Sequence, residues 1–305
     1  MNKAPHQNWP GFLIAGTARA GTTALHEHLG KHPKLFMPLQ KEPCFFTFYN
    51  EHPEFHNSKH NYITDADAYL QLGADGEGKM WGESSTPYMY FFEKSVANME
   101  KLVPDSRKLK IVLVLRDPAE RAYSQYMHNR RDLREPLTFE EAIEAEKERM
   151  ANNWHFDFFY VDKGFYYAQV KYFMEHFDDV KVLLFEDFEQ NSDKVVSEVL
   201  EFLGLEMIDD LKDVKKRNQS GEMKVKWVKR LMSNRSNPIL NGIRAMLSKK
   251  ARKRLRNFVK NLLLNYNLKK VKMGKSTRNK LVNVYRDDIK QLQELTGKDL
   301  SAWLK

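Results

Sequence analysis

The residues best suited to chemistry lie in a loop of small side chains within "GFLIAGTARAGTTALHEHL", residues 11 to 29. An apolar run, Phe12–Ala15, precedes the spacing Gly16-x-x-x-x-Gly21-Thr22-Thr23, and a helical pattern follows. The glycines let the backbone curl so that successive N–H groups point inward, and the next helix adds the positive end of its dipole. The threonine hydroxyls can donate to the same oxygens. This pattern predicts a site for a phosphate-type anion.

The loop lacks the lysine of a nucleotide-hydrolysing phosphate loop, because Thr22 stands at that position. Arg19 supplies a positive charge from within the loop instead. An NTPase or kinase also needs a strand-end aspartate for Mg²⁺, and the candidate Asp117 lies between Arg116 and Pro118. The sequence therefore favours an anion that needs no metal, and a phosphate-loop kinase or NTPase stays the alternative.

A second anion-binding pattern occurs in "VLVLRDPAERAYSQY", where an apolar strand ends in Arg116 and the following helix carries Ser124. Arginine offers a bidentate fork and serine a hydroxyl donor, which together suit a phosphate dianion. The structural alternative is a salt bridge from Arg116 to Asp117 or Glu120.

Taken together, these two motifs resemble those of the sulfotransferases that use 3′-phosphoadenosine-5′-phosphosulfate (PAPS). "GTARAGTTAL" is similar to their 5′-phosphosulfate loop, and Arg116 and Ser124 match the pair that binds the 3′-phosphate. The resemblance implies PAPS as cosubstrate, its desulfated form PAP as product, and no metal. It also implies that eight residues bind the nucleotide: Arg19, Ala20, Gly21, Thr22, Thr23, Ala24, Arg116 and Ser124.

Further stretches resemble the branch of bacterial and glycan-modifying members: "KEPCFF" at 41 to 46 and "GESSTPYMY" at 82 to 90. In that branch the glutamate of the first stretch is the general base, so the resemblance assigns this role to Glu42, with Arg19 assisting the leaving group. It places the acceptor beside four residues: Lys41, Glu83, Ser85 and Tyr88. Two positions depart from the pattern, because Arg19 replaces a common lysine and Ser84 replaces the lysine of several glycan O-sulfotransferases.

Other side chains offer alternatives for the base. Glu42 precedes Pro43, so it can instead pair with Lys41 at a turn. Glu83 and two histidines of a polar loop, His56 and His60, are reserve candidates. The histidines in or just after the first helix are expected to pack rather than to react: His26, His28 and His32.

The elements that position these residues alternate between strands and helices. Strand-like runs occur at 12–15, 79–82, 111–115 and 180–185, and helical patterns at 22–30, 95–102, 119–130, 138–151, 166–177 and 193–203. This order predicts a P-loop-like, three-layer α/β fold with a mostly parallel sheet and helices on both faces. We expect one domain over 1–305, with a nucleotide-binding core at about 11–205 and a helical, basic C-terminal extension at about 221–305.

Composition fits this fold and adds a charge asymmetry. The chain has 305 residues, an apolar fraction of 42%, one cysteine and a net charge of +9. Residues 223–280 hold 19 Lys and Arg and no Asp or Glu. This stretch suggests an anionic acceptor, a carrier protein or a membrane surface as partner. It includes Lys269 and Lys270 as guesses for nucleotide contacts.

Three functions follow from these patterns. The leading prediction is an enzyme that moves a sulfuryl group from PAPS to a hydroxyl or amine of a saccharide or small natural product. The second is the kinase or NTPase, and the third is a non-enzymatic binder of anionic surfaces. Nucleic acid is the weakest partner, because few aromatic residues interleave the basic ones. The single Cys44 and the absence of an apolar leader predict a cytoplasmic location.

Overall fold

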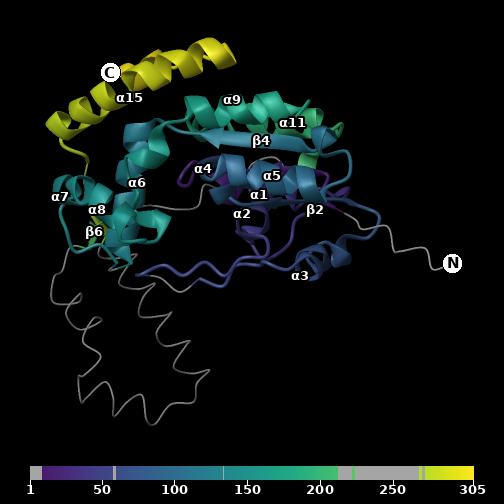
Figure 1. Cartoon of the computed structure of the whole chain (residues 1–305). Helices are drawn as coiled ribbons and strands as arrows, with labels where there is room; N and C mark the ends of the chain where they lie inside the picture. Colours follow the sequence, from purple (N-terminus) through teal and green to yellow (C-terminus); the bar gives the residue numbers. More distant parts are fainter. Residues whose placement is uncertain (1–8, 58–59, 133, 212–221, 224–267, 270–271) are drawn as a thin grey trace, which may run out of the picture.

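Five strands form a fully parallel sheet in the order β2-β3-β1-β4-β5 (Figure 1). The computed structural model describes residues 9–57, 60–132, 134–211, 222–223, 268–269 and 272–305. Within those ranges, no helix combines the length and hydrophobicity that a bilayer crossing requires. The strands are β1 Phe12–Ile14, β2 Leu35–Phe36, β3 Met80–Ser84, β4 Lys110–Leu115 and β5 Val180–Leu184.

Helices cover both faces of the sheet, because successive strand residues point to opposite sides and both sides are apolar. Phe12, Ile14 and Val112 pack against α1 (Thr22–Leu29) and α11 (Ser192–Phe202). The alternate residues face the other layer, which contains α5 (Phe92–Leu102), α6 (Pro118–Arg131), α9 (Tyr167–His176) and α15 (Lys275–Thr296). The predicted three-layer α/β architecture is confirmed.

Short elements complete the described chain. α2 (Phe45–Phe48) and α4 (Pro87–Tyr90) pack against each other and against α5. A two-stranded antiparallel pair, β6 and β7, lies beside α6. The remaining helices are α3 Ala66–Gln71, α7 Phe139–Glu144, α8 Glu146–Ala151 and α10 Phe185–Gln190; β6 is Glu222–Met223, β7 is Leu268–Lys269, and the 3-10 turns used below are η3 Phe156–Phe158 and η4 Asp162–Gly164.

The strand order gathers the phosphate-binding segments. β1 lies between β3 and β4, and Ile14 pairs with both Ser84 and Val112. Because parallel strands end at the same edge, the segments that follow these three strands start side by side. The fold thus brings together the loop after β1, the "STP" turn after β3 and Arg116 after β4.

The structure differs from the sequence prediction at three places. The single helix expected at 138–151 is two helices, α7 and α8, which meet at Ala145. The short strand β2 had no sequence signal. The region beyond residue 221 is not all helical, since β6 and β7 occur there, and α15 packs on α9 and joins the main core through Leu281 and Tyr285 rather than extending from it. Most of the predicted helical extension, residues 224–267, lies outside the described residues.

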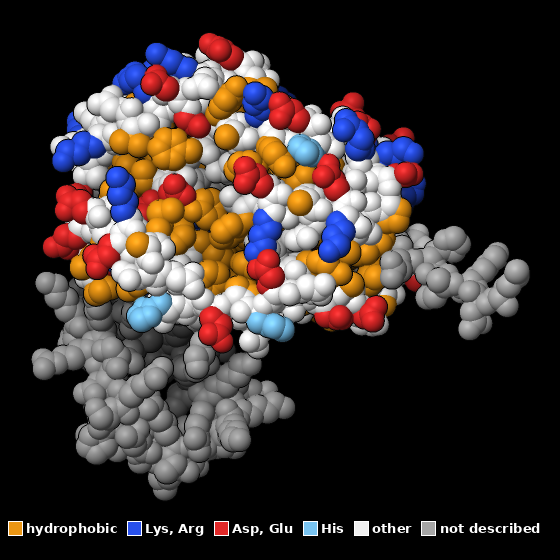
Figure 2. All heavy atoms as spheres, in the orientation of Figure 1, with side chains coloured by type: hydrophobic (Ala, Val, Ile, Leu, Met, Phe, Trp, Pro, Cys, Tyr) orange, Lys and Arg blue, Asp and Glu red, His pale blue; other side chains and the backbone are white. Residues whose placement is uncertain are grey.

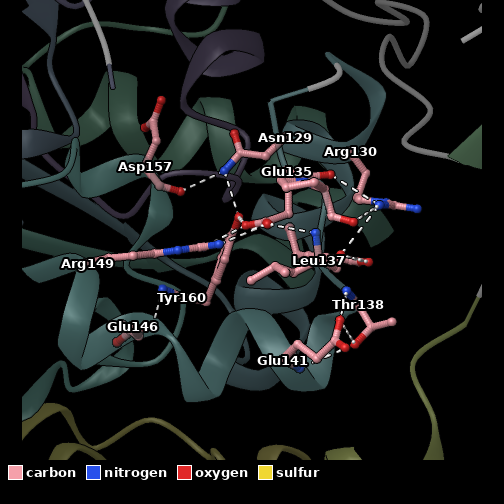
Figure 3. A network of polar contacts seen from close by, with 12 residues as sticks. Asn129, Arg130, Glu135, Leu137, Thr138, Glu141, Glu146, Arg149, Asp157 and Tyr160 are labelled. Atoms are coloured by element: carbon pink, nitrogen blue, oxygen red, sulfur yellow. Dashed lines mark hydrogen bonds and ion pairs between the residues drawn. The ribbon is translucent and has the colours of Figure 1, made fainter. Parts of the chain in front are cut away.

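A buried ion pair fixes the segment that follows α6 (Figure 3). Both terminal nitrogens of Arg149 donate to the Glu135 carboxylate, at 2.6 and 2.9 Å. The Tyr160 hydroxyl donates to the same carboxylate at 2.7 Å, and Asn129 Nδ2 donates to the Tyr160 hydroxyl at 2.9 Å. Because Glu135 and Arg149 are nearly inaccessible to water, solvent cannot replace either partner of the ion pair.

We expect Glu135→Ala to lower the free energy of unfolding by about 3–5 kcal/mol, because it leaves the Arg149 guanidinium buried without its carboxylate. Denaturant unfolding of the full chain measures this change. Glu148→Ala, on the exposed side of α8, is the matched control and should shift stability by less than about 0.5 kcal/mol. Equal effects of the two variants would contradict a structural role for the pair.

Candidate active site

The loop after β1, residues 16–21, has the geometry of an anion site and is called the phosphate loop below. The Thr17 N–H donates to the Val114 carbonyl at 2.8 Å, and a Cβ at Gly16 would lie 2.2 Å from the Val114 nitrogen, so only glycine fits there. Gly21 takes φ 84° as it enters α1. No side chain caps α1 and no acid lies in its first turn. Its first N–H groups are therefore available to an anionic ligand.

The predicted 3′-phosphate residues lie against this loop. Arg116 Nη1 donates to the Arg19 carbonyl at 3.0 Å, and its guanidinium lies over the Phe185 ring at 4.5 Å. Arg19 Nε donates to Ser124 Oγ at 3.3 Å. The structure thus joins the two motifs, which are about a hundred residues apart in the chain, into one cationic cluster of Arg19, Arg116 and Ser124.

Asp117 and Glu120, the carboxylates near Arg116 in the sequence, pair with Arg278 instead. Arg278 of α15 donates to Asp117 at 2.7 Å and contacts Glu120 at 3.4 Å. Asp117 also caps α6 by accepting the N–H groups of Ala119 and Glu120. The alternative salt bridge from Arg116 to these acids is therefore not formed. Asp117 is also engaged as a cap and ion-pair partner, which argues against the Mg²⁺ role that a kinase requires.

Positive charge accumulates at this cluster. Burial, reinforced by the charges of Arg131 and Arg116, lowers the pKa of Arg19 to about 10. Burial and the charges of Arg19 and Arg131 lower the pKa of His128 to about 4, so this imidazole is neutral near pH 7. Sequence reasoning missed Arg131 and His128. Their spacing from Ser124, four and then three residues along α6, places all three on one helix face and is a signal that could have found them.

A second segment, residues 41–44, crosses beside the phosphate loop and is called the strap. Lys41 Nζ donates to Glu42 Oε1 at 2.6 Å and to Thr22 Oγ1 at 3.4 Å. The Thr86 N–H donates to Glu42 Oε2 at 2.9 Å, and the Glu42 N–H donates to the Ser84 carbonyl at 3.0 Å. The predicted pairing of Glu42 with Lys41 is therefore present. The carboxylate is still 35% exposed, so it remains within reach of a ligand.

The predicted acceptor contacts Glu83, Ser85 and Tyr88 lie behind the strap. All three are 0% exposed, so their side chains offer no surface to a substrate in this conformation. Ser85 Oγ donates to Glu83 at 2.9 Å and accepts the N–H of Cys44 at 3.0 Å. Burial raises the pKa of Glu83 to about 7. The three residues support the strap from beneath, and their predicted contact with an acceptor stays a prediction.

Sequence reasoning did not single out His155 and Asp157, which lie at η3 beside Tyr62 and His60. The Asp157 N–H donates to His155 Nδ1 at 3.1 Å, so the other nitrogen of this ring, Nε2, carries the proton and donates to the Tyr62 hydroxyl oxygen at 2.6 Å. The Tyr62 hydroxyl keeps its own hydrogen to donate elsewhere. His60, His155 and Asp157 lie close enough to hold a metal ion, but both nitrogens of the His155 ring are already engaged.

The predicted histidines have separate outcomes. His26, His28 and His32 are buried and bond to backbone carbonyls, so the expectation that they pack is met. The reserve bases His56 and His60 stack on Trp154 and His155, respectively. For Lys269 and Lys270 no side-chain position is described.

Figure 2 shows one face of the molecule, on which acidic, basic and apolar side chains are interspersed. This face carries no continuous field of one sign among the described residues. Most of the basic stretch 223–280 lies outside the described residues, so its predicted anionic partner stays a prediction.

Comparison with known proteins agrees with this site. A sulfotransferase from Alicyclobacillus acidocaldarius has the same fold with a TM-score of 0.71 and 28% identity, over 97% of this chain and 99% of that one. The heparan sulfate N-deacetylase/N-sulfotransferase 1 of Xenopus laevis is 29% identical over 209 residues, which are 65% of this chain and 22% of that protein. The membrane-associated sulfotransferase kil1 of Dictyostelium discoideum is 32% identical over 117 residues, 38% of this chain and 22% of that protein.

The chain thus spans about a fifth of the length of the curated relatives it matches. The profile of the family described as "Sulfotransferase domain" matches residues 10–273, which include the phosphate loop, the strap and the Arg116–Ser124 pair. The chain belongs to the sulfotransferase family.

Proposed function

We propose that this protein transfers a sulfuryl group from PAPS to a hydroxyl or amine of a saccharide or small-molecule acceptor, with Glu42 as general base. One observation supports this proposal most directly: two anion-binding sites lie side by side. The first is the uncapped start of α1, and the second is the cluster of Arg19, Arg116 and Ser124. PAPS carries phosphate groups at both ends of one ribose. A ligand with a single phosphate would use only half of this arrangement.

Each predicted nucleotide contact then has a physical role. The loop from Arg19 to Ala24 and the first turn of α1 would hold the 5′-phosphosulfate through N–H groups and the Thr22 and Thr23 hydroxyls. Arg116 and Ser124 would hold the 3′-phosphate, with the arginine stacked on Phe185.

The reaction needs positive charge on the leaving oxygen and a base on the acceptor. The acceptor atom attacks sulfur while the bond from sulfur to the 5′-phosphate oxygen breaks, and PAP leaves with that electron pair. Lys41 suits the developing negative charge, because its ammonium lies between Thr22 and Glu42. Glu42 takes the acceptor proton, and its bonds to Thr86 hold the carboxylate in position.

The proposed class of acceptor is based on the names of similar proteins. Several are named as heparan sulfate N-sulfotransferases, which supports a saccharide amine or hydroxyl. A carrier protein, an anionic acceptor or a membrane surface bound through residues 223–280 is a further proposal that needs its own test. Binding to anionic but not neutral lipid vesicles would support the membrane.

Calorimetric titration tests the nucleotide site first. We expect PAP to bind without Mg²⁺ and 5′-AMP to bind much more weakly, because only PAP fills both anion sites. Arg116→Ala should weaken PAP binding by roughly ten- to hundredfold, the loss of a charge-assisted contact, and leave 5′-AMP nearly unchanged. Arg107→Ala, an exposed arginine paired with Asp178, is the control. Mg²⁺-dependent ATP binding without PAP binding would overturn the proposal.

Glu42→Gln tests the base. The amide can still accept from the Thr86 N–H, so the strap should keep its place, yet it cannot take a proton. We expect turnover to fall roughly 10²–10⁴-fold with PAP affinity close to wild type. Labelled sulfate transfer to a panel of amino-sugar, sugar-hydroxyl and phenolic acceptors measures this. Glu198→Gln on α11 is the matched control, and wild-type turnover by Glu42→Gln would remove Glu42 from the mechanism.

A further inference from the structure

Lys163 is a buried cation without an anion beside it. It lies in η4, is 5% exposed and forms no hydrogen bond or ion pair with the described part of the chain. Its ammonium instead faces two aromatic rings, those of Phe156 at 5.2 Å and Tyr90 at 5.7 Å from their centroids. Aromatic faces attract a cation, but they compensate a buried charge only in part.

The nearest acids are already engaged elsewhere. Asp157 Oδ2 accepts from Arg134 at 2.9 Å, and Asp162 Oδ2 accepts from the Tyr90 hydroxyl at 2.5 Å. These contacts hold both carboxylates in fixed positions. The charge of Asp157 acts on the Lys163 ammonium, yet Lys163 forms no ion pair with either acid.

A second buried cation adds to the excess. Arg121 is 0% exposed; its Nη2 donates to the Tyr160 carbonyl, while Nε and Nη1 have no hydrogen-bond partner among the described residues. The buried carboxylate nearby, Glu146, accepts three backbone N–H groups, those of residues 160, 161 and 162, at 2.5, 2.7 and 2.7 Å. Lys163 and Arg121 therefore lie near Glu146, whose carboxylate is already hydrogen-bonded to the backbone, and Lys163 has no ion-pair partner of its own in the described part of the chain.

Packing holds Lys163 in this position. A Cβ at Gly164 would lie 2.7 Å from the Tyr285 ring, so the turn sits directly against α15. The Tyr285 hydroxyl donates to the Val161 carbonyl at 2.9 Å. The Glu146 carboxylate fixes the turn from the other side by accepting the N–H groups of Val161 and Asp162. The lysine is thus preorganised rather than folded in from the surface.

One aromatic cluster joins the surroundings of Lys163 to the strap. The Glu42 carboxylate is among the charges that act on both Lys163 and Tyr62. The same aromatic cluster extends from Cys44 of the strap to Phe156, which flanks the ammonium. An acceptor that presents its reacting atom to Glu42 would therefore lie next to these rings and this cation.

We propose that Lys163 binds an oxyanion of the acceptor, a carboxylate or sulfate group carried on an apolar or ring scaffold, and so selects acidic acceptors. The inference rests on the proposed function for what the acceptor is. Lys163 is a specificity residue here and takes no part in the proton transfer. Without an acceptor, the buried charge of Lys163 destabilises the folded protein. A bound acceptor oxyanion neutralises that charge.

Benzoate is the probe, because it joins a carboxylate to an aromatic ring, and benzamide is its neutral match. With PAP saturating, so that the phosphate sites are filled, we expect benzoate to bind the wild type and benzamide to bind much more weakly. Lys163→Met should lower benzoate affinity roughly ten- to hundredfold, while Lys163→Arg retains it. Lys171→Met, an exposed lysine of α9, is the control and should match wild type.

The pH dependence of stability gives a readout that a structural lysine would not produce. Burial, then the charge of Arg121, outweigh the attraction of Asp157, Glu42 and Glu146 and lower the pKa of Lys163 from 10.5 to about 8. The unfolded chain therefore binds the proton more tightly, and the charge destabilises the folded protein most below pH 8. Without ligand, Lys163→Met should melt no lower than wild type at pH 6–7, and its advantage should shrink as pH rises above 8. Benzoate affinity should fall about tenfold per pH unit above 8.

Three results would overturn the inference: equal binding of benzoate and benzamide, wild-type benzoate affinity in Lys163→Met, or a lower melting temperature of Lys163→Met and Lys163→Gln at pH 6–7. PAP titration of the same samples separates the two proposals. PAP binding without Lys163-dependent benzoate binding sinks only this inference. Lys163-dependent benzoate binding without PAP binding sinks the sulfotransferase proposal instead.

Discussion

Positive charge held close together at the carboxyl ends of β1 and β4 is the constraint on which the rest of the site depends. Arg19 and Arg116 repel each other, yet the Arg116 guanidinium bonds to the carbonyl of Arg19 and stacks on Phe185. Arg131 is balanced by Asp132 at 3.1 Å. The protein thus stabilises each cation through backbone, aromatic or single acidic contacts. It leaves the sum of the charges positive for a ligand that carries more than one negative group.

The strap holds the Glu42 carboxylate beside Lys41 and leaves it partly exposed. Glu42 and Cys44 both have positive φ, at 57° and 55°, on either side of Pro43. Hydrogen bonds from the layer beneath, through Ser85 to Glu83, stabilise this unusual backbone. The buried Glu83 therefore acts on the reacting side of the site through the backbone it supports, and sequence position alone could not separate the two carboxylates.

Short motifs could be predicted from the sequence, because neighbouring residues in the chain determine their backbone geometry. A strand followed by Gly16 and Gly21 and then a helix predicts an anion loop, and the structure places Arg116 and Ser124 against it. The role proposed for Lys163 could not be predicted from the sequence, because it depends on tertiary packing that buries the ammonium away from any carboxylate partner. The break at Ala145 and the packing of α15 were also missed, since tertiary contacts rather than periodicity decide them. Burial of Ser85 was missed for the same reason.

The contact between Arg278 and Asp117 has a consequence for the order in which the protein forms. Asp117 caps the helix that begins one residue after it and directly follows Arg116, so this corner of the nucleotide site stays incomplete without α15. Tyr285 of the same helix fills the core behind Val161. On the ribosome, the five strands of the sheet are complete once residue 184 has emerged. The corner around Asp117 forms only after the segment carrying Arg278 has left the exit tunnel, so it is a late event in synthesis.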